Sequence, residues 1–212
     1  MRSEEVKKRT FADEARRGQL VDCAIELIAE RGYPQTSLAK IAERAGVAKS
    51  VVLYHFTNKD ELVAAIVGAV FTASAGVIIP ALAGAATSVG RLAAYVDAHR
   101  DFLRDHGTAA MALYDISTSY RSADGLRFDQ LVQADVDAAG VPPEFAQLDP
   151  QGIIESGLAT GEFVTTMPPR LIADALRAAL DGAVANLARV PLFDVSGYLD
   201  VVKHTFLSAL EA

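Results

Sequence analysis

The stretch that decides the fold lies near the N-terminus, where residues 36–56 read TSLAKIAERAGVAKSVVLYHF. Its spacing predicts two short helices, near 37–45 and 48–55, joined at Gly46, where a glycine permits a sharp turn. Alanines precede that turn and are small enough for two helices to cross closely. The stretch is therefore predicted to be a helix-turn-helix. Its small core is expected to contain Ile41, Val47, Val52 and Phe56.

The second of these helices is predicted to carry an outward polar face. That face holds Lys49, Ser50, Val51, Tyr54 and His55. A short helix with such side chains can enter the major groove of DNA and contact base edges. Two alternatives stay open. The helix pair packs in this way without binding DNA, or Tyr54 and His55 are half-buried residues at the helix end.

The segment from Arg17 to Leu62 resembles the DNA-binding domain of the TetR family of transcriptional repressors. The resemblance implies a homodimer that binds a palindromic operator in double-stranded DNA and is released by a small ligand. By position it implies that Thr36, Tyr54, His55 and Lys59 contact phosphate, and that Lys49, Ser50 and Val51 face the groove. It rests on residues at fixed spacing: Ala24, Gly32-Tyr33, Thr36-Ser37, Ile41-Ala42, Ala45-Gly46-Val47, Tyr54-His55-Phe56 and Lys59-Asp60-Glu61-Leu62.

Some positions of this segment differ from residues that are common in the family. Ala48 stands where Ser is common, so a helix cap worth about 1 kcal/mol is lost. Gly is common at the position of Ser50, Thr at Val51 and Tyr at Leu53. These differences concern the base contacts and leave the expected fold unchanged.

The whole chain is predicted to be all-α, because Gly and Pro separate helical stretches and alternating strand patterns are almost missing from the sequence. Residues 1–57 are expected to form a three-helix DNA-binding domain and residues 58–212 a helical effector-binding and dimerisation domain. Asn58, with Glu61 three residues later, forms a capping-box pattern, and Pro80 is expected to end the helix that begins there. The predicted helices lie near 11–31, 37–45, 48–55, 58–79, 88–105, 108–121, 126–139, 148–160, 168–189 and 194–211.

Charge is unevenly distributed along the chain. The net charge is −7 at pH 7, yet residues 1–62 hold 11 Lys and Arg against 10 Asp and Glu, while residues 63–212 hold 9 against 17. This pattern is typical of a nucleic-acid-binding head on an acidic body. Lys7, Lys8 and Arg9 could form an arm that reaches DNA, although a short charged run is more often simply solvated. A single Cys and an N-terminus without an apolar signal core favour the cytoplasm.

The segment from Leu62 to Gly90 contains 29 residues without a charge. It exceeds the about 20 apolar residues that span a bilayer, so a membrane-associated helical protein is one alternative. Against that alternative stand Pro80, several Gly, Ser and Thr residues, and the lack of Trp or Tyr at either end of the segment. We expect no membrane partner and a helix that is buried in the body.

Aromatic and polar side chains in the predicted body helices are candidates for an effector pocket. Unpaired polar groups cost about 1–3 kcal/mol each when buried, so they need partners or a ligand. Because these helices carry few charges, the expected ligand is small and largely apolar. Simple core packing of the aromatic residues is the competing interpretation, and a protein of the same fold without an effector is another. The candidates are Phe71, His99, Phe102, Met111, Tyr114 and Asp115.

Residues 168–189 are rich in small side chains, which let helices approach closely. In the family that the sequence resembles, late helices of two subunits form a four-helix bundle, so we expect the dimer interface here and at 148–160. Close packing inside one subunit is the alternative. The candidate interface residues are Ala175, Ala178, Ala179, Gly182, Ala183 and Asn186. The sequence contains no phosphate-binding loop, nucleophile motif or paired metal-ligand motif, and we predict no enzymatic activity, catalytic residue, metal or cofactor.

Overall fold

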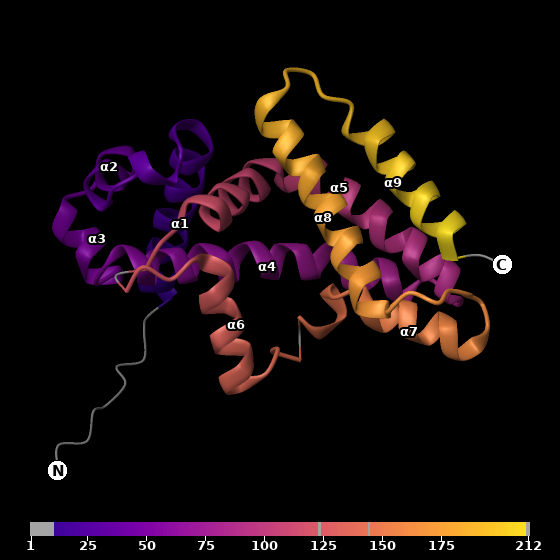
Figure 1. The fold of residues 1–212 in the computed structure, drawn as a ribbon. Helices are drawn as coiled ribbons and strands as arrows, with labels where there is room; N and C mark the ends of the chain where they lie inside the picture. The colour runs from indigo at the N-terminus through magenta and orange to yellow at the C-terminus, as the bar shows by residue number, and fades with distance from the viewer. Residues whose placement is uncertain (1–10, 123, 144, 211–212) are drawn as a thin grey trace, which may run out of the picture.

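The computed structural model describes residues 11–122, 124–143 and 145–210, and within these ranges the fold is all-α, as predicted. Figure 1 shows a head and a larger body. The head consists of α1 (Phe11–Arg31), a 3-10 turn η1 (Tyr33–Gln35), α2 (Leu38–Arg44) and α3 (Lys49–His55). The predicted arm at Lys7, Lys8 and Arg9 lies outside the described residues.

The head has the predicted helix-turn-helix form. Ser37 caps α2, because its side chain accepts a hydrogen bond from the Lys40 N–H at 3.3 Å. Gly46 takes a φ of 65° in the turn between α2 and α3, a conformation that favours glycine. Residues of the predicted core are fully buried against α1: Ile41, Val52 and Phe56, with Leu20, Ala24 and Ile28.

One helix, α4 (Lys59–Ala83), leaves the head and crosses the body. Asn58 caps it by accepting from the Glu61 N–H at 2.8 Å, as the capping pattern predicts. The prediction that Pro80 ends this helix was wrong. Pro80 and Gly76, the residue whose carbonyl loses its helical partner, are both exposed. Water can therefore satisfy that carbonyl, and the helix continues to Ala83.

The expectation that the uncharged segment is buried holds for one side of α4 only. Leu62, Ile66 and Val70 face the core, whereas Gly68, Thr72 and other small residues are exposed. By length and composition α4 could cross a membrane, and 28% of its most apolar window is buried in the chain. In this fold, however, its inward side forms much of the body core.

The body is built around α5 (Ser88–Ser119), which bends at His106. Backbone angles of −130° and 25° at His106 fall between the two helices predicted at 88–105 and 108–121. The remaining elements are α6 (Phe128–Ala139), η2 (Ala146–Leu148), α7 (Gln151–Thr160), α8 (Pro169–Arg189) and α9 (Val195–Leu210). In Figure 1, α8 and α9 lie along α5, while α6 projects from the body.

The packing of α7 leads to a test of this fold. A methyl group on Gly157 would lie 2.1 Å from Cδ2 of Phe163, which is buried, whereas Gly152 on the same helix has nothing within 4 Å of that position. We expect Gly157→Ala to lower the free energy of unfolding by about 1–3 kcal/mol through overpacking. Gly152→Ala should change it little or raise it by up to about 1 kcal/mol. Urea denaturation of both variants measures this, and equal stabilities would contradict the packing of α7.

Candidate nucleic-acid interface and effector region

The outer face of α3 is the exposed surface of the helix-turn-helix. Lys49 and Ser50 are exposed, and Tyr54 and Leu53 have exposed fractions of 68% and 44%. A cation, a hydroxyl, a phenol and an apolar side chain on one short helix can contact both the hydrogen-bonding edges of bases and the methyl group of thymine. Val51, a predicted groove residue, is partly buried.

Leu53 was missed as a candidate contact. Its signal in the sequence is that it follows Lys49 by four residues, which puts the two side chains on the same face of a helix. In the structure both are exposed on α3.

Two residues that were predicted to contact DNA lie inside the head. Thr36 is 3% exposed, and its hydroxyl donates to the Gly32 carbonyl at 3.1 Å. His55 is 5% exposed, so its prediction as an outer-face residue was wrong. It follows Val52 by three residues and so shares the buried side of α3, with its ring against that of Tyr54 at 5.0 Å. The alternative of a buried residue at the helix end describes His55 correctly.

Lys59, a predicted phosphate contact, is half-buried at the start of α4. Its ammonium group donates to the Tyr33 carbonyl at 2.9 Å and lies 3.6 Å from the centroid of the Tyr33 ring. Burial lowers the pKa of this amine, and the neighbouring carboxylate of Asp60 partly opposes that effect. In this conformation Lys59 therefore fixes the turn before α2.

A polar and aromatic contact connects the head to the last turns of α5. We call it the joint, and it consists of Tyr33, Lys59, Asp60, Asp115 and Tyr120. The Tyr33 N–H donates to the Asp115 carboxylate, and the Tyr120 hydroxyl donates to Asp60 Oδ1 at 2.8 Å. The rings of Tyr33 and Tyr120 meet edge to face with centroids 5.7 Å apart.

Burial raises the pKa of both phenols of the joint. It raises the pKa of Tyr33 to about 12, with a further contribution from Asp60. The pKa of Tyr120 is also raised, first by burial and then by its hydrogen bond to Asp60. Tyr120 is therefore a hydrogen-bond donor to Asp60 at neutral pH and above it.

Asp115 was predicted to line an effector pocket, but it belongs to the joint. One of its carboxylate oxygens accepts from Tyr33 in the head, and the other accepts from the Ser119 hydroxyl at 3.1 Å. The partner in the head is 82 positions away in the sequence. A buried polar group does need a partner, but here the partner is the head rather than a ligand.

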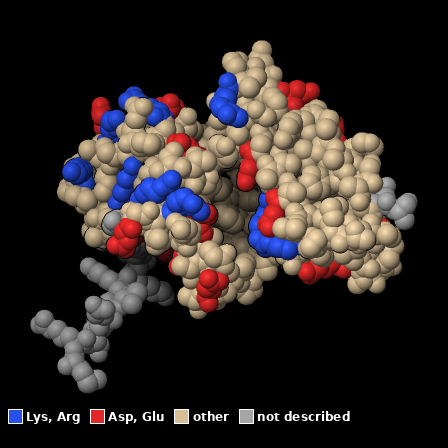
Figure 2. Space-filling model, viewed as in Figure 1, with Lys and Arg blue, Asp and Glu red and all other residues tan. Residues whose placement is uncertain are grey.

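The other pocket candidates divide between the two sides of the α5 bend. His99 and Phe102 precede it, and Met111 and Tyr114 follow it. Phe71 on α4 packs against Phe145, with ring centroids 5.7 Å apart. Figure 2 shows a hollow over α4, between the head and α8, while Lys and Arg atoms in this view gather mainly on the head side. A separate shallow groove lies between α1 and α4, away from these candidates.

His99 is a neutral polar group in this region. Its Nδ1 is 2.8 Å from the Tyr95 carbonyl, one turn earlier on α5. Burial lowers the pKa of His99 to about 4, and its hydrogen bond with Tyr95 opposes the shift. At neutral pH its ring therefore carries no charge and is compatible with a largely apolar ligand.

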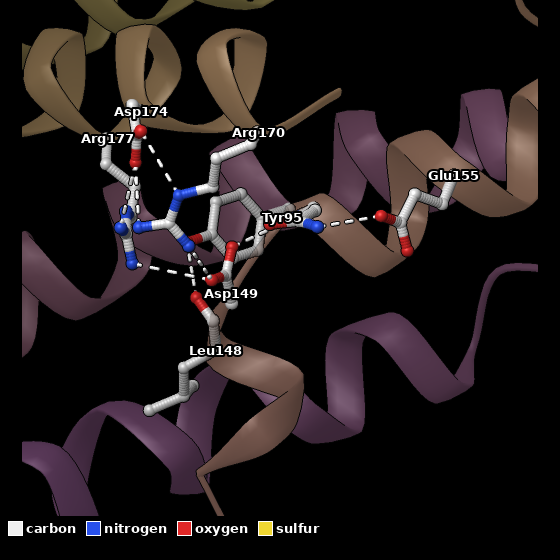
Figure 3. Close-up of polar contacts among 8 residues, drawn as sticks. Tyr95, Leu148, Asp149, Glu155, Arg170, Asp174 and Arg177 are labelled. Carbon is white, nitrogen blue, oxygen red and sulfur yellow. Dashed lines mark hydrogen bonds and ion pairs between the residues drawn. The ribbon is translucent and has the colours of Figure 1, made fainter. Parts of the chain in front are cut away.

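An ion-pair network fixes the segment after α6 against α8 (Figure 3). Asp149 Oδ2 lies 3.2 Å from an Arg170 nitrogen and 3.7 Å from an Arg177 nitrogen, and Asp174 pairs with both arginines at 3.1 Å. Beside it, the Tyr95 hydroxyl donates to the Leu148 carbonyl at 2.7 Å. These contacts connect η2 to both α5 and α8.

The small residues of α8 serve two different surfaces. Ala183 is fully buried in its own subunit, and the carbonyl of Ala179 accepts from the Tyr198 hydroxyl at 3.0 Å. A methyl group on Gly182 would lie 2.7 Å from the same hydroxyl. Ala179 and Gly182 therefore pack α8 against its own α9, whereas Ala183 is buried in the body core. Asn186 is partly buried, and Ala175 and Ala178 are exposed.

Comparison with known proteins agrees with this architecture. Residues 20–66 match the family model described as bacterial regulatory proteins, tetR family. The fatty acid metabolism regulator protein of Bacillus subtilis (strain 168) is 46% identical over 44 residues, which are 21% of this chain and 23% of that protein. The transcriptional activator FasR of Mycolicibacterium smegmatis is 38% identical over 88 residues, 42% of this chain and 40% of FasR. The chain thus spans less than half the length of the curated relatives that it matches.

The fold is similar over nearly the whole chain to that of FadR from Bacillus subtilis, solved in complex with stearoyl-CoA. The TM-score is 0.74 at 22% identity, covering 91% of this chain and 98% of FadR. Both structures have an all-α architecture. In this chain one long helix, α4, joins the N-terminal helix-turn-helix head to the all-α body. Residues 20–66 thus match the tetR family model, and the fold of the chain is similar to that of FadR.

The contrast between Lys49 and Lys59 leads to the second prediction. Lys59→Ala removes a hydrogen bond and a cation–π contact, and we expect it to lower the free energy of unfolding by about 1–2 kcal/mol. Lys49→Ala removes an exposed side chain and should change that energy by less than about 0.5 kcal/mol. Denaturation curves of the two variants measure the difference, and equal curves would mean that Lys59 does not hold Tyr33.

Proposed function

We propose that this protein is a cytoplasmic transcriptional regulator that binds a palindromic DNA operator as a homodimer and responds to a small, largely apolar ligand. One observation carries the proposal. The exposed face of α3, with Lys49, Ser50, Leu53 and Tyr54, belongs to a helix-turn-helix whose position on the body is fixed by α4 and by the joint. Such a face supports recognition of base edges in DNA. The fixed position of the head supports control of DNA binding by the conformation of the body.

Homodimerisation follows from how helix-turn-helix heads read DNA. Two heads bind neighbouring half-sites when their recognition helices are about 34–36 Å apart, one turn of the duplex. The exposed faces of α8 and α9 support a symmetric contact, because they leave Leu171 62% and Val201 65% exposed beside Ala175 and Ala178. We infer that a second copy of the chain covers this surface, with α8 and α9 of both copies forming a four-helix bundle.

A long acyl chain is the ligand class that we propose. The FadR structure of similar fold holds stearoyl-CoA, and one curated relative is a regulator of fatty acid metabolism. In this chain α4 carries no charge after Glu61, Phe71 on α4 packs against Phe145, and His99 on α5 is neutral. These groups support an apolar guest. We propose that its binding displaces α4 and α5 relative to each other, moves the heads and releases DNA, as in a repressor.

DNA selection tests the proposed function. Random duplexes selected by the purified protein should converge on a palindrome, and Lys49→Ala should change the preferred bases without unfolding the protein. Stearoyl-CoA should then lower affinity for that operator at least about tenfold, which corresponds to about 1.4 kcal/mol of coupling. CoA alone should have no such effect, and Phe71→Ala should weaken the response. Selection without a consensus would reject the regulator, whereas a consensus without a stearoyl-CoA effect would reject only the ligand class.

The proposed dimer can be tested with one exposed alanine. Ala178→Glu would bury two unpaired carboxylates across a symmetric interface, so we expect the dissociation constant of the dimer to rise about 100-fold or more. The same substitution at the exposed Ala134 on α6 provides the control and should leave the dimer intact. Analytical ultracentrifugation with circular dichroism measures assembly and folding together. A folded Ala178→Glu dimer would place the interface elsewhere.

A further inference from the structure

Besides the packing of α1 against α4 and α5, two connections of different kinds hold the head on the body. The first is covalent, because α4 begins at Lys59, directly after the head, and continues to Ala83. The second is the joint, in which the last turns of α5 contact η1 and the first turn of α4. The joint adds directional hydrogen bonds to the packing of α1 on α5, and it so restricts rotation of the head about its short link to α4.

The residues on the body side of the joint are Asp115 and Tyr120. Asp115 holds the backbone of Tyr33, five residues before α2 begins, and Tyr120 holds Asp60, five residues after α3 ends. The helix-turn-helix is thus fixed at the entry to α2 and at the exit from α3. Rotation of the head relative to α5 would have to break one of these hydrogen bonds.

The same α5 packs against α8 and α9. In the homodimer that we propose, α8 and α9 meet the second copy. The distance between the two recognition helices is therefore set by one chain of contacts, which runs from the interface through α5 and the joint to each head. The joint is the step of this chain at which the body meets the helix-turn-helix.

We infer that Asp115 and Tyr120 are positioning residues for DNA binding that determine which half-site spacing the homodimer selects, without touching DNA themselves. This inference rests on the proposed function. One base pair added between half-sites moves them apart by about 3.4 Å and rotates them by about 34°. A head held by the joint as well as by α4 and α1 resists such a change, and a head without the hydrogen bonds of the joint tolerates it more readily.

The test uses variants that remove hydrogen bonds and keep most of the packing. Tyr120→Phe removes the hydroxyl that contacts Asp60 and retains the ring beside Tyr33. Asp115→Ala removes the acceptor for the Tyr33 N–H, whereas Asp115→Asn retains an acceptor and serves as the conservative variant. Tyr95→Phe is the matched control, because it also removes a hydrogen bond from a buried tyrosine to its acceptor, the Leu148 carbonyl, away from the head.

Each protein is measured with three kinds of duplex: the selected operator, the same operator with one base pair inserted between half-sites, and a single half-site. We expect the parent and Tyr95→Phe to prefer the selected spacing at least about tenfold. In Tyr120→Phe/Asp115→Ala this preference should fall below about threefold, while affinity for the single half-site stays within about twofold of the parent. Asp115→Asn should restore most of the preference.

Four outcomes distinguish the possible explanations. An unchanged spacing preference in the folded double variant overturns the inference. Equal losses for the operator and the single half-site also overturn it, because they indicate a damaged head rather than a displaced one. If the double variant loses its helical circular dichroism signal, the single variant Tyr120→Phe decides the question. The quantity compared is again the ratio of affinities for the selected operator and for the operator with one inserted base pair. A parent that selects no DNA sequence rejects the proposed function itself, a result that the selection experiment reveals before any variant is compared.

Discussion

The position of the head depends on how Tyr33 is held. Its N–H donates to Asp115, its carbonyl accepts from Lys59, and its ring lies under the Lys59 ammonium and against the Tyr120 ring. Gly32 makes this possible, because a φ of 84° turns the chain out of α1 in a conformation that favours glycine. A buried aromatic residue with both backbone groups paired is a rigid point, and α2 begins five residues after it.

The joint also explains why charged residues occur where an apolar body meets the head. Lys59 and Asp115, which are partly buried, and the exposed Asp60 each have a partner. The rest of α4 carries no charge beyond Glu61 and depends on apolar packing. The apolar packing of α4 in the body is non-directional, so α4 can slide against its neighbours. The hydrogen bonds of the joint, at one end of α4, are directional. In the mechanism that we propose, motion in the body is transmitted to the head through α4 and that directional contact.

The sequence predicted the elements well because their signals are local. Gly46 in the turn and the Asn58 cap act within a few residues of the helix ends that they mark. The same is true of the break predicted between 105 and 108, where α5 bends at His106. It predicted the roles of Lys59, His55 and Asp115 poorly, because each role depends on a distant partner or on which side of a short helix is covered. Helical periodicity places His55 correctly once Val52 is known to be buried, whereas the contact between Asp115 and Tyr33 spans 82 positions.

The small residues of α8 show why composition alone does not locate an interface. A small side chain indicates close approach of another element, but it does not say which element approaches. Tyr198 resolves the question for Gly182 and Ala179, since its hydroxyl fills the space beside them from within the same subunit. Ala175 and Ala178 have no such neighbour and remain exposed. The surface that a second copy can cover is therefore narrower than the small-residue stretch, and it is displaced toward Leu171 and the start of the helix.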